Sequence, residues 1–164
     1  MKLRALAFCV IALLPAAAAG QAAEKAPATG KASAAKGAGR TITINADDKM
    51  KYDLTTIAAK PGEKLHVVLK SVGTMPKTVM GHNFVLPKPG ESALEINNAA
   101  FNARATDFIP VEMKDKILAF TPLAGPGETV EVTFNAPAKA GSYPYMCTFP
   151  GHFAMGMKGA LVVK

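Results

Sequence analysis

Four side chains able to bind a soft metal ion lie close together in YMCTFPGHFAMGMKG, the segment that starts at residue 145. They are Cys147, His152, Met155 and Met157. Pro and Gly at positions 150 and 151 predict a turn between the cysteine and the histidine. The thiol and the imidazole can therefore face one point across a loop, and the question is which chemistry they serve there.

The start of the chain indicates export. Lys2 and Arg4 precede a short apolar run, which is followed by small residues, and this is the layout of a secretory signal peptide. We predict a signal peptide over residues 1–23, cleaved near 19–23, with a retained N-terminal anchor as the alternative. The apolar run is shorter than the roughly 20 residues that a membrane-spanning helix needs.

Cleavage would leave Cys147 without a partner, because Cys9 is removed with the signal peptide. An unpaired cysteine in an oxidising compartment needs an explanation other than a disulfide. One thiolate, two neutral imidazoles and a weak thioether contact form the type of site that binds copper for electron transfer. His152 offers one imidazole, and His82 in KTVMGHNFVL offers the second. The third histidine, His66, lies in a predicted strand on the solvent face, which favours a structural role.

The elements that must position these residues are mostly short strands. Period-two patterns bounded by Gly- and Pro-containing turns predict antiparallel strands in an all-β sandwich. One segment, residues 92–108, has helical spacing with Leu94, Ala99 and Phe101 among its apolar residues, and we predict a short helical insert that ends by Pro110. The predicted strands cover residues 41–45, 64–70, 83–86, 128–134, 141–147 and 158–164.

The basic composition says little about partners. The net charge is +7, but most of the excess lies in the leader and in residues 24–40, which are rich in Ala, Gly and Lys. Those residues contain no large apolar side chain, and we predict a flexible tether. The folded domain is expected over residues 41–164, with no nucleic acid partner, no transmembrane span in the mature chain and a monomeric state.

MPKTVMGHNFVL and CTFPGH, the latter followed by MKG, resemble the two ligand segments of the azurin group of cupredoxins, the small blue copper proteins. The resemblance extends over most of residues 41–164 and implies a Greek-key β-sandwich (cupredoxin-like) with one copper ion. It implies that His82, Cys147 and His152 are the strong ligands. It also implies that the Gly81 carbonyl is a further weak axial contact and that Asn83 ties the two ligand loops together.

The chain departs from azurins in three ways. Gly156 stands where azurins place the axial methionine, so the longer spacing to Met157 resembles that of plastocyanins and auracyanins, with Met155 as the competitor. The chain has no cysteines for the disulfide that azurins carry near their N-terminal strands. The tryptophan that azurins place after His-Asn is Phe84 here, still expected in the core.

The resemblance also implies a docking surface for redox partners. Met75, Met80, Phe149 and Ala154, with Val79, match the apolar patch around the exposed edge of His152. Met113 is expected in the core.

Backbone N–H groups near Asn83 and Phe149 are expected to donate to the Cys147 sulfur, which would raise the reduction potential.

We therefore predict a periplasmic or otherwise exported one-electron carrier, and not an enzyme. Delivery or sequestration of copper is the alternative function, and zinc is chemically possible with the same ligands. A nucleophilic Cys147 with His152 as its base is disfavoured, because the cysteine ends a predicted strand and no third orienting group is evident.

Overall fold

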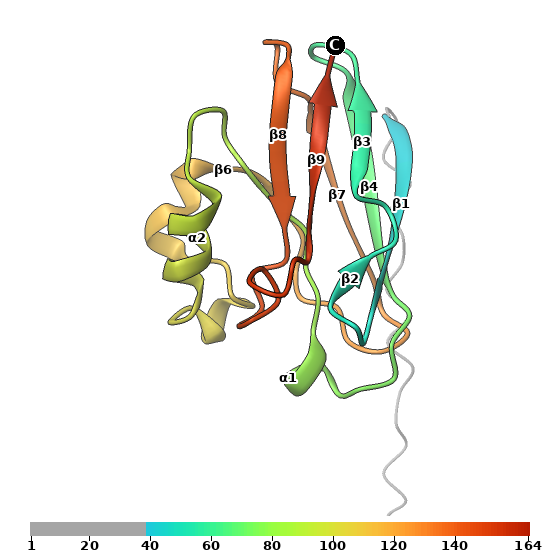
Figure 1. Cartoon of the computed structure of the whole chain (residues 1–164), viewed down its shortest axis with the longest axis vertical. Helices are drawn as coiled ribbons and strands as arrows, with labels where there is room; N and C mark the ends of the chain where they lie inside the picture. The colour runs from blue at the N-terminus through green and yellow to red at the C-terminus, as the bar shows by residue number, and fades with distance from the viewer. Residues whose placement is uncertain (1–38) are drawn as a thin grey trace, which may run out of the picture. The chain divides into compact units, whose positions relative to one another are not determined.

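The computed structural model describes residues 39–164, which form two packed β-sheets (Figure 1). The predicted signal peptide and nearly all of the predicted tether lie outside the described residues. The first sheet has the order β2-β1-β4-β7 and the second the order β3-β9-β8-β5-β6, so the all-β sandwich is confirmed. The first sheet contains β1 (Arg40–Asp47), β2 (Lys51–Tyr52), β4 (Lys64–Ser71) and β7 (Thr129–Asn135). The second contains β3 (Thr56–Ala59), β9 (Lys158–Val163), β8 (Gly141–Met146), β5 (Val85–Pro87) and β6 (Ile117–Phe120).

Alternation along the strands divides core from solvent as the sequence predicts. In β4, Leu65, Val67 and Leu69 are fully buried, while His66 on the opposite face lies 3.0 Å from Glu131 on β7. Phe84 is also fully buried, with its ring centroid 5.1 Å from that of Tyr145. One hydrophobic core between the sheets therefore reaches the strand ends near His82 and Cys147.

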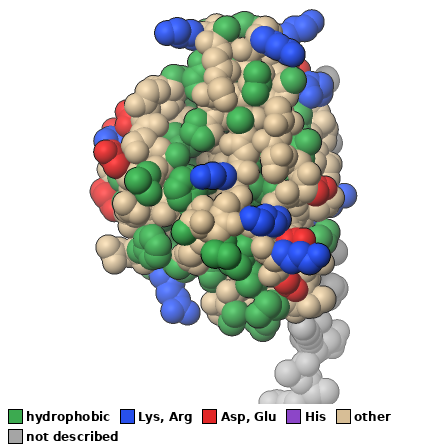
Figure 2. Space-filling view, viewed as in Figure 1, with side chains coloured by type: hydrophobic (Ala, Val, Ile, Leu, Met, Phe, Trp, Pro, Cys, Tyr) green, Lys and Arg blue, Asp and Glu red, His purple; other side chains and the backbone are tan. Residues whose placement is uncertain are grey.

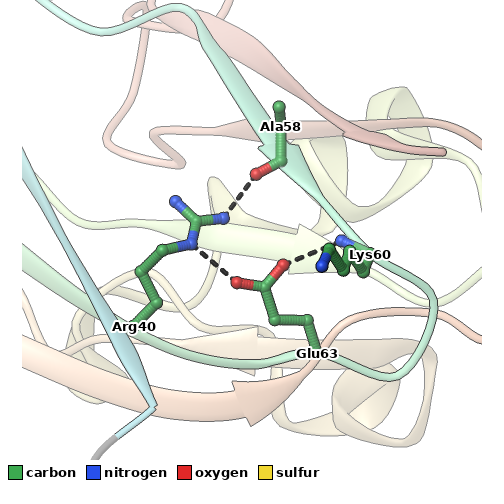
Figure 3. Close-up of polar contacts among 4 residues, drawn as sticks. All are labelled: Arg40, Ala58, Lys60 and Glu63. Carbon is green, nitrogen blue, oxygen red and sulfur yellow. Dashed lines mark hydrogen bonds and ion pairs between the residues drawn. The ribbon is translucent and has the colours of Figure 1, made fainter.

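The first strand starts slightly earlier than the predicted strand over residues 41–45. Arg40 already belongs to β1, one residue before the expected boundary. Its Nε donates to Glu63 Oε1 at 2.6 Å and its Nη2 donates to the Ala58 carbonyl in β3, while the second Glu63 oxygen accepts from Lys60 N (Figure 3). These contacts connect one end of β1 to a strand of the other sheet.

The insert between β5 and β6 is helical, as predicted, but it is not one helix. Helix α2 (Ala93–Ala100) is capped by Ser92, and two 3-10 turns follow at Arg104–Thr106 and Val111–Lys116. The helix ends at Ala100, well before residue 108, and the first 3-10 turn ends where Asp107 and Phe108 adopt positive φ, 56° and 59°. Met113 in the second turn packs against the buried cluster beneath the insert, as expected.

The predicted apolar face of this helix is wrong. Leu94 and Phe101 are 57% and 51% exposed, and the side that faces the core carries Ile96, Asn97 and Ala100. A rotation of the buried face by about a third of a turn separates the two sets. So short a helix offers too few apolar positions to fix the face from spacing alone. Among residues 39–164, no helix is long and apolar enough to cross a membrane.

Candidate metal centre

Three buried side chains converge between the sheets at one end of the sandwich. The donor atoms of His82, Cys147 and His152 all lie within 4.8 Å of one another, and each residue is at most 2% exposed. Cys147 directly follows β8, and His152 lies in the loop between β8 and β9. His82 follows α1 (Lys77–Met80) and precedes β5. The structure thus brings together the three residues that the sequence predicts.

The loop from Cys147 to Met157 is held by its own backbone. His152 N donates to the Phe149 carbonyl at 3.1 Å, and Met157 N donates to the His152 carbonyl at 2.9 Å. Cys147 N then donates to the Met157 carbonyl at 3.1 Å, which closes the loop at its base. Gly151 and Gly156 adopt φ of 88° and 87°, a conformation that other residues rarely take. The two glycines of this loop are therefore needed, because the backbone takes a positive φ at both positions.

The segment that carries His82 is held by neighbouring parts of the chain. His82 N and the His82 carbonyl form an isolated bridge with Ala124, at 2.9 and 2.7 Å. Gly81 has an ordinary φ of −75°, but a Cβ there would lie 2.6 Å from Leu123 Cδ2 and 2.7 Å from the Lys77 carbonyl oxygen. Close approach, and not an unusual dihedral angle, therefore explains the glycine before His82.

Asn83 connects the two segments. Its side-chain Oδ1 accepts from Thr148 N at 2.9 Å, and its Nδ2 donates to Thr148 Oγ1 at 2.9 Å and to the Asp107 carbonyl at 3.1 Å. Asn83 and Thr148 are buried, so these bonds form away from water. The contacts fit the linking role that the resemblance implies for Asn83, and Thr148 is a partner that the sequence reasoning missed.

Burial shifts the pKa values of the three donor side chains and so sets their protonation states before a metal binds. It raises the pKa of the Cys147 thiol to about 11, while backbone N–H groups of Asn83 and Phe149 donate toward the sulfur and oppose that rise. Burial, and then the nearby His82, lowers the pKa of His152 to about 4. The pKa of His82 is also lowered by burial, against the opposing charges of Asp48 and Asp47. Both imidazoles are therefore neutral near pH 7, the form that binds metals.

The donor atoms fit a bound metal ion. Cys147 Sγ lies 3.4 Å from His152 Nδ1, a separation that suits two atoms bound to one metal at about 2 Å each. Both ring nitrogens of His82 are buried without a hydrogen-bond partner in the described part of the chain. A buried polar atom without a partner is costly, and coordination of a metal would satisfy it.

The two methionines of the loop differ in burial. Met157 is fully buried and joins the core cluster that includes Cys147, whereas Met155 is 57% exposed. The Met155 carbonyl accepts a hydrogen bond from Lys51 Nζ at 2.5 Å, which holds this part of the loop against the start of β2. Burial therefore favours Met157 over Met155 as the thioether of the site.

The apolar patch is present but differs from its expected composition. Met75 and Val79 are 38% and 53% exposed, and Ala154 is exposed as well. Figure 2 shows hydrophobic side chains gathered at the end of the molecule where α1 lies.

Two members of the patch lie deeper than predicted. Met80 is half-buried, and Phe149 is only 8% exposed. The ring of Phe149 lies 4.7 Å from that of His152 and covers it, so the expected exposed edge of His152 is wrong, because only 2% of that residue is accessible. Phe149 can still be reached from solvent, because it lines a surface pocket together with Lys77, Thr78, Arg104, Asp107, Phe108 and Leu123.

Comparison with known proteins places this geometry in a family. Residues 38–164 match the family described as copper binding proteins, plastocyanin/azurin family. Auracyanin-A of Chloroflexus aurantiacus is 40% identical over 127 residues, which make up 76% of this chain and 74% of that protein. An azurin of Pseudomonas fluorescens biotype C is 36% identical over 129 residues, 75% of this chain and 97% of that protein.

The similarity extends to solved structures. A dithionite-reduced auracyanin from the photosynthetic bacterium Roseiflexus castenholzii superposes with a TM-score of 0.68 at 36% identity, covering 78% of this chain and 99% of that one. Auracyanin A, described as a blue copper protein, gives a TM-score of 0.66 at 39% identity, covering 76% and 98%. The fold, the buried Cys-His-His group and these matches agree, and the chain belongs to the plastocyanin/azurin family of copper binding proteins.

Proposed function

We propose that the protein is a type 1 (blue) copper protein that carries single electrons between redox partners in the periplasm. His82, Cys147 and His152 are its three strong ligands, Met157 is the weak axial ligand and the Gly81 carbonyl is a further weak contact. The observation that carries the proposal is the convergence of three buried donor atoms within 4.8 Å of one another. Within residues 39–164, neither ring nitrogen of His82 has a hydrogen-bond partner.

Each ligand has a distinct task in this proposal. Copper bound at the site supplies a centre that alternates between Cu(II) and Cu(I). The Cys147 thiolate forms a covalent bond that suits the soft reduced ion, and the neutral imidazoles serve both oxidation states. The loop hydrogen bonds and the Asn83–Thr148 contacts limit how far the ligands can move when the electron arrives.

Partners are proposed to dock on the apolar patch formed by Met75, Val79, Met80, Ala154 and Phe149. Exposed methionine suits brief contacts with more than one partner, because its side chain is flexible and polarisable. Electrons would pass between a docked partner and His152 by way of the Phe149 surface, since the two rings are 4.7 Å apart. The periplasmic location, the signal peptide over residues 1–23, the tether over residues 24–40 and the monomeric state stay predictions.

Addition of Cu(II) to the purified mature protein tests the proposal. An intense blue absorption band with a narrow copper hyperfine splitting is expected, and Cys147→Ser should abolish both. A pale colour with ordinary hyperfine splitting would show that Cys147 does not bind copper, and would favour the alternative of copper delivery. Full burial of the donor residues argues against that alternative, because it slows the loss of metal to an acceptor.

A further inference from the structure

Tyr52 contacts the ligand segment from the other sheet, and neither the sequence motifs nor the ligand set points to it. Its hydroxyl donates a hydrogen bond to the carbonyl oxygen of Asn83. We propose that Tyr52 is a positioning residue for the Cys147 sulfur: by holding the Asn83 carbonyl, it fixes the Asn83 N–H that donates to that sulfur. This inference rests on the proposed function, because it assigns Tyr52 a part in tuning the copper thiolate.

Every polar group of Asn83 has a partner, and Tyr52 supplies one of them. The N–H of Asn83 is directed to Cys147, and the side chain is bonded to Thr148 and to the Asp107 carbonyl. All of these partners belong to the second sheet or to the loops that follow it. The carbonyl alone is held from the first sheet, through Tyr52 in β2, which pairs with Ala46 of β1.

The hydroxyl of Tyr52 keeps the proton that it donates. Tyr52 is 5% exposed, and its ring lies 5.7 Å from that of Tyr145 in the core. Burial, followed by the nearby Cys147, raises the pKa of Tyr52 well above its ordinary value, so the hydroxyl stays protonated. A protonated phenol that lies against a carbonyl retains the proton that the hydrogen bond needs.

Removal of this hydroxyl would loosen Asn83 without emptying space in the core. Tyr52→Phe keeps the ring and leaves the buried Asn83 carbonyl without its phenolic donor. The Asn83 segment is then free to shift, which weakens the N–H bond to the sulfur. Hydrogen bonds to a metal-bound thiolate reduce its electron density and stabilise the reduced metal. Tyr52→Phe is therefore expected to lower the reduction potential and to move the sulfur-to-copper absorption band.

The chain offers a matched control in Tyr145. This residue is fully buried, and its hydroxyl also donates to a backbone carbonyl, that of Leu54. Leu54 lies between β2 and β3 and is not part of either ligand segment. Tyr145→Phe thus removes the same group from the same core two positions before Cys147, but the carbonyl that loses its donor is that of Leu54.

Two measurements on the full mature chain decide the question. In the metal-free protein, amide hydrogen exchange at Asn83 should be about tenfold faster in Tyr52→Phe and unchanged in Tyr145→Phe. In the copper-loaded protein, the potential and the blue band should shift in Tyr52→Phe alone. Equal shifts in both variants, or unchanged exchange at Asn83 in Tyr52→Phe, would overturn the inference. Failure of the proposed function would be distinct, because wild-type protein would then lack the Cys147-dependent blue band.

Discussion

The two chain segments that carry the ligand candidates are held in different ways. The loop from Cys147 to Met157 closes on itself through backbone hydrogen bonds and two glycines with positive φ. The segment around His82 has few local contacts and depends on Ala124, Thr148 and Tyr52, which belong to distant parts of the chain. Contacts within the loop from Cys147 to Met157 fix its conformation, whereas the conformation around His82 depends on contacts with other parts of the fold.

This difference predicts where each part of the site is vulnerable. A change in the loop acts on the local turn, and its effects should remain near the residue that is changed. A change near His82 also removes partners from other elements, so it should affect stability and copper properties together. The Asn83–Thr148 contact joins the two segments, and its loss should have the largest effect.

Asn83→Ala tests that link. It would leave the buried Thr148 N–H and the partly buried Asp107 carbonyl without their hydrogen bonds. At about 2 kcal/mol for each abandoned group, the free energy of unfolding should fall by about 4 kcal/mol. Urea unfolding of the metal-free protein measures this, and the blue band of the copper form should weaken.

Asn97→Ala is the matched control for that experiment. Asn97 is also a buried asparagine, but its Oδ1 has no hydrogen-bond partner within residues 39–164. Its replacement should cost about 1 kcal/mol and leave the blue band unchanged. If both asparagine variants lost the same stability, Asn83 would not be a link between the segments.

Acidification of the metal-free protein tests the loop without altering its backbone. The pKa of His152 is about 4 in the folded protein and 6.5 in an unfolded chain, because burial opposes the charged ring. The folded state therefore binds fewer protons, and its stabilisation by the neutral ring is present above pH 6.5 and lost as the pH falls toward 4. The loss should reach at most about 3 kcal/mol, with His82 acting in the same direction.

Urea unfolding of the metal-free protein between pH 7 and pH 4 measures that loss. This range starts above the ordinary pKa of histidine and reaches the pKa of about 4 of the buried His152 ring. His152→Gln should remove most of the slope, and the copper-loaded protein should show little of it, because bound metal occupies the ring nitrogen. An unchanged slope in His152→Gln would contradict the assignment.

Gly81→Ala tests the segment that depends on its neighbours. The new Cβ would meet the Lys77 carbonyl oxygen at 2.7 Å and Leu123 Cδ2 at 2.6 Å, so backbone must move. We expect a loss of about 2 kcal/mol in the free energy of unfolding and a weaker blue band. Gly90→Ala is the control, since Gly90 has a φ of 88° with open space around it and lies away from the ligands. If the blue band were as weak in Gly90→Ala as in Gly81→Ala, general destabilisation would explain the weaker band of Gly81→Ala.

The sequence predicts the sandwich because period-two burial along a strand is a local property. Leu65, Val67 and Leu69 alternate with residues that are at least partly exposed, and the structure buries all three. The strands that sequence reasoning missed are short: β2 has 2 residues, and β3 and β6 have 4 each. So few residues cannot display a period, and their pairing is decided by strands far along the chain.

The site residues also differ in whether nearby or distant parts of the sequence determine their contacts. Cys147, His152 and Met157 stand in one short segment, so the turns between them could be predicted from local residues. The partners Thr148 and Tyr52 could not be predicted in the same way, because their contacts cross 65 and 31 positions of sequence. The burial of His152 could not be predicted either, since the position of the neighbouring Phe149 ring depends on how the loop packs.

Replacement of the two loop methionines by leucine has the smallest expected effect on stability. It tests whether Met157 or Met155 is the thioether ligand. Met157→Leu conserves volume in a fully buried position and should cost less than about 1.5 kcal/mol. It removes a thioether that favours the oxidised metal, so the reduction potential should rise. Met155→Leu, at a position that is 57% exposed, should leave both quantities unchanged. Voltammetry of the two copper-loaded variants compares them, and a larger potential shift in Met155→Leu would transfer the axial role to Met155.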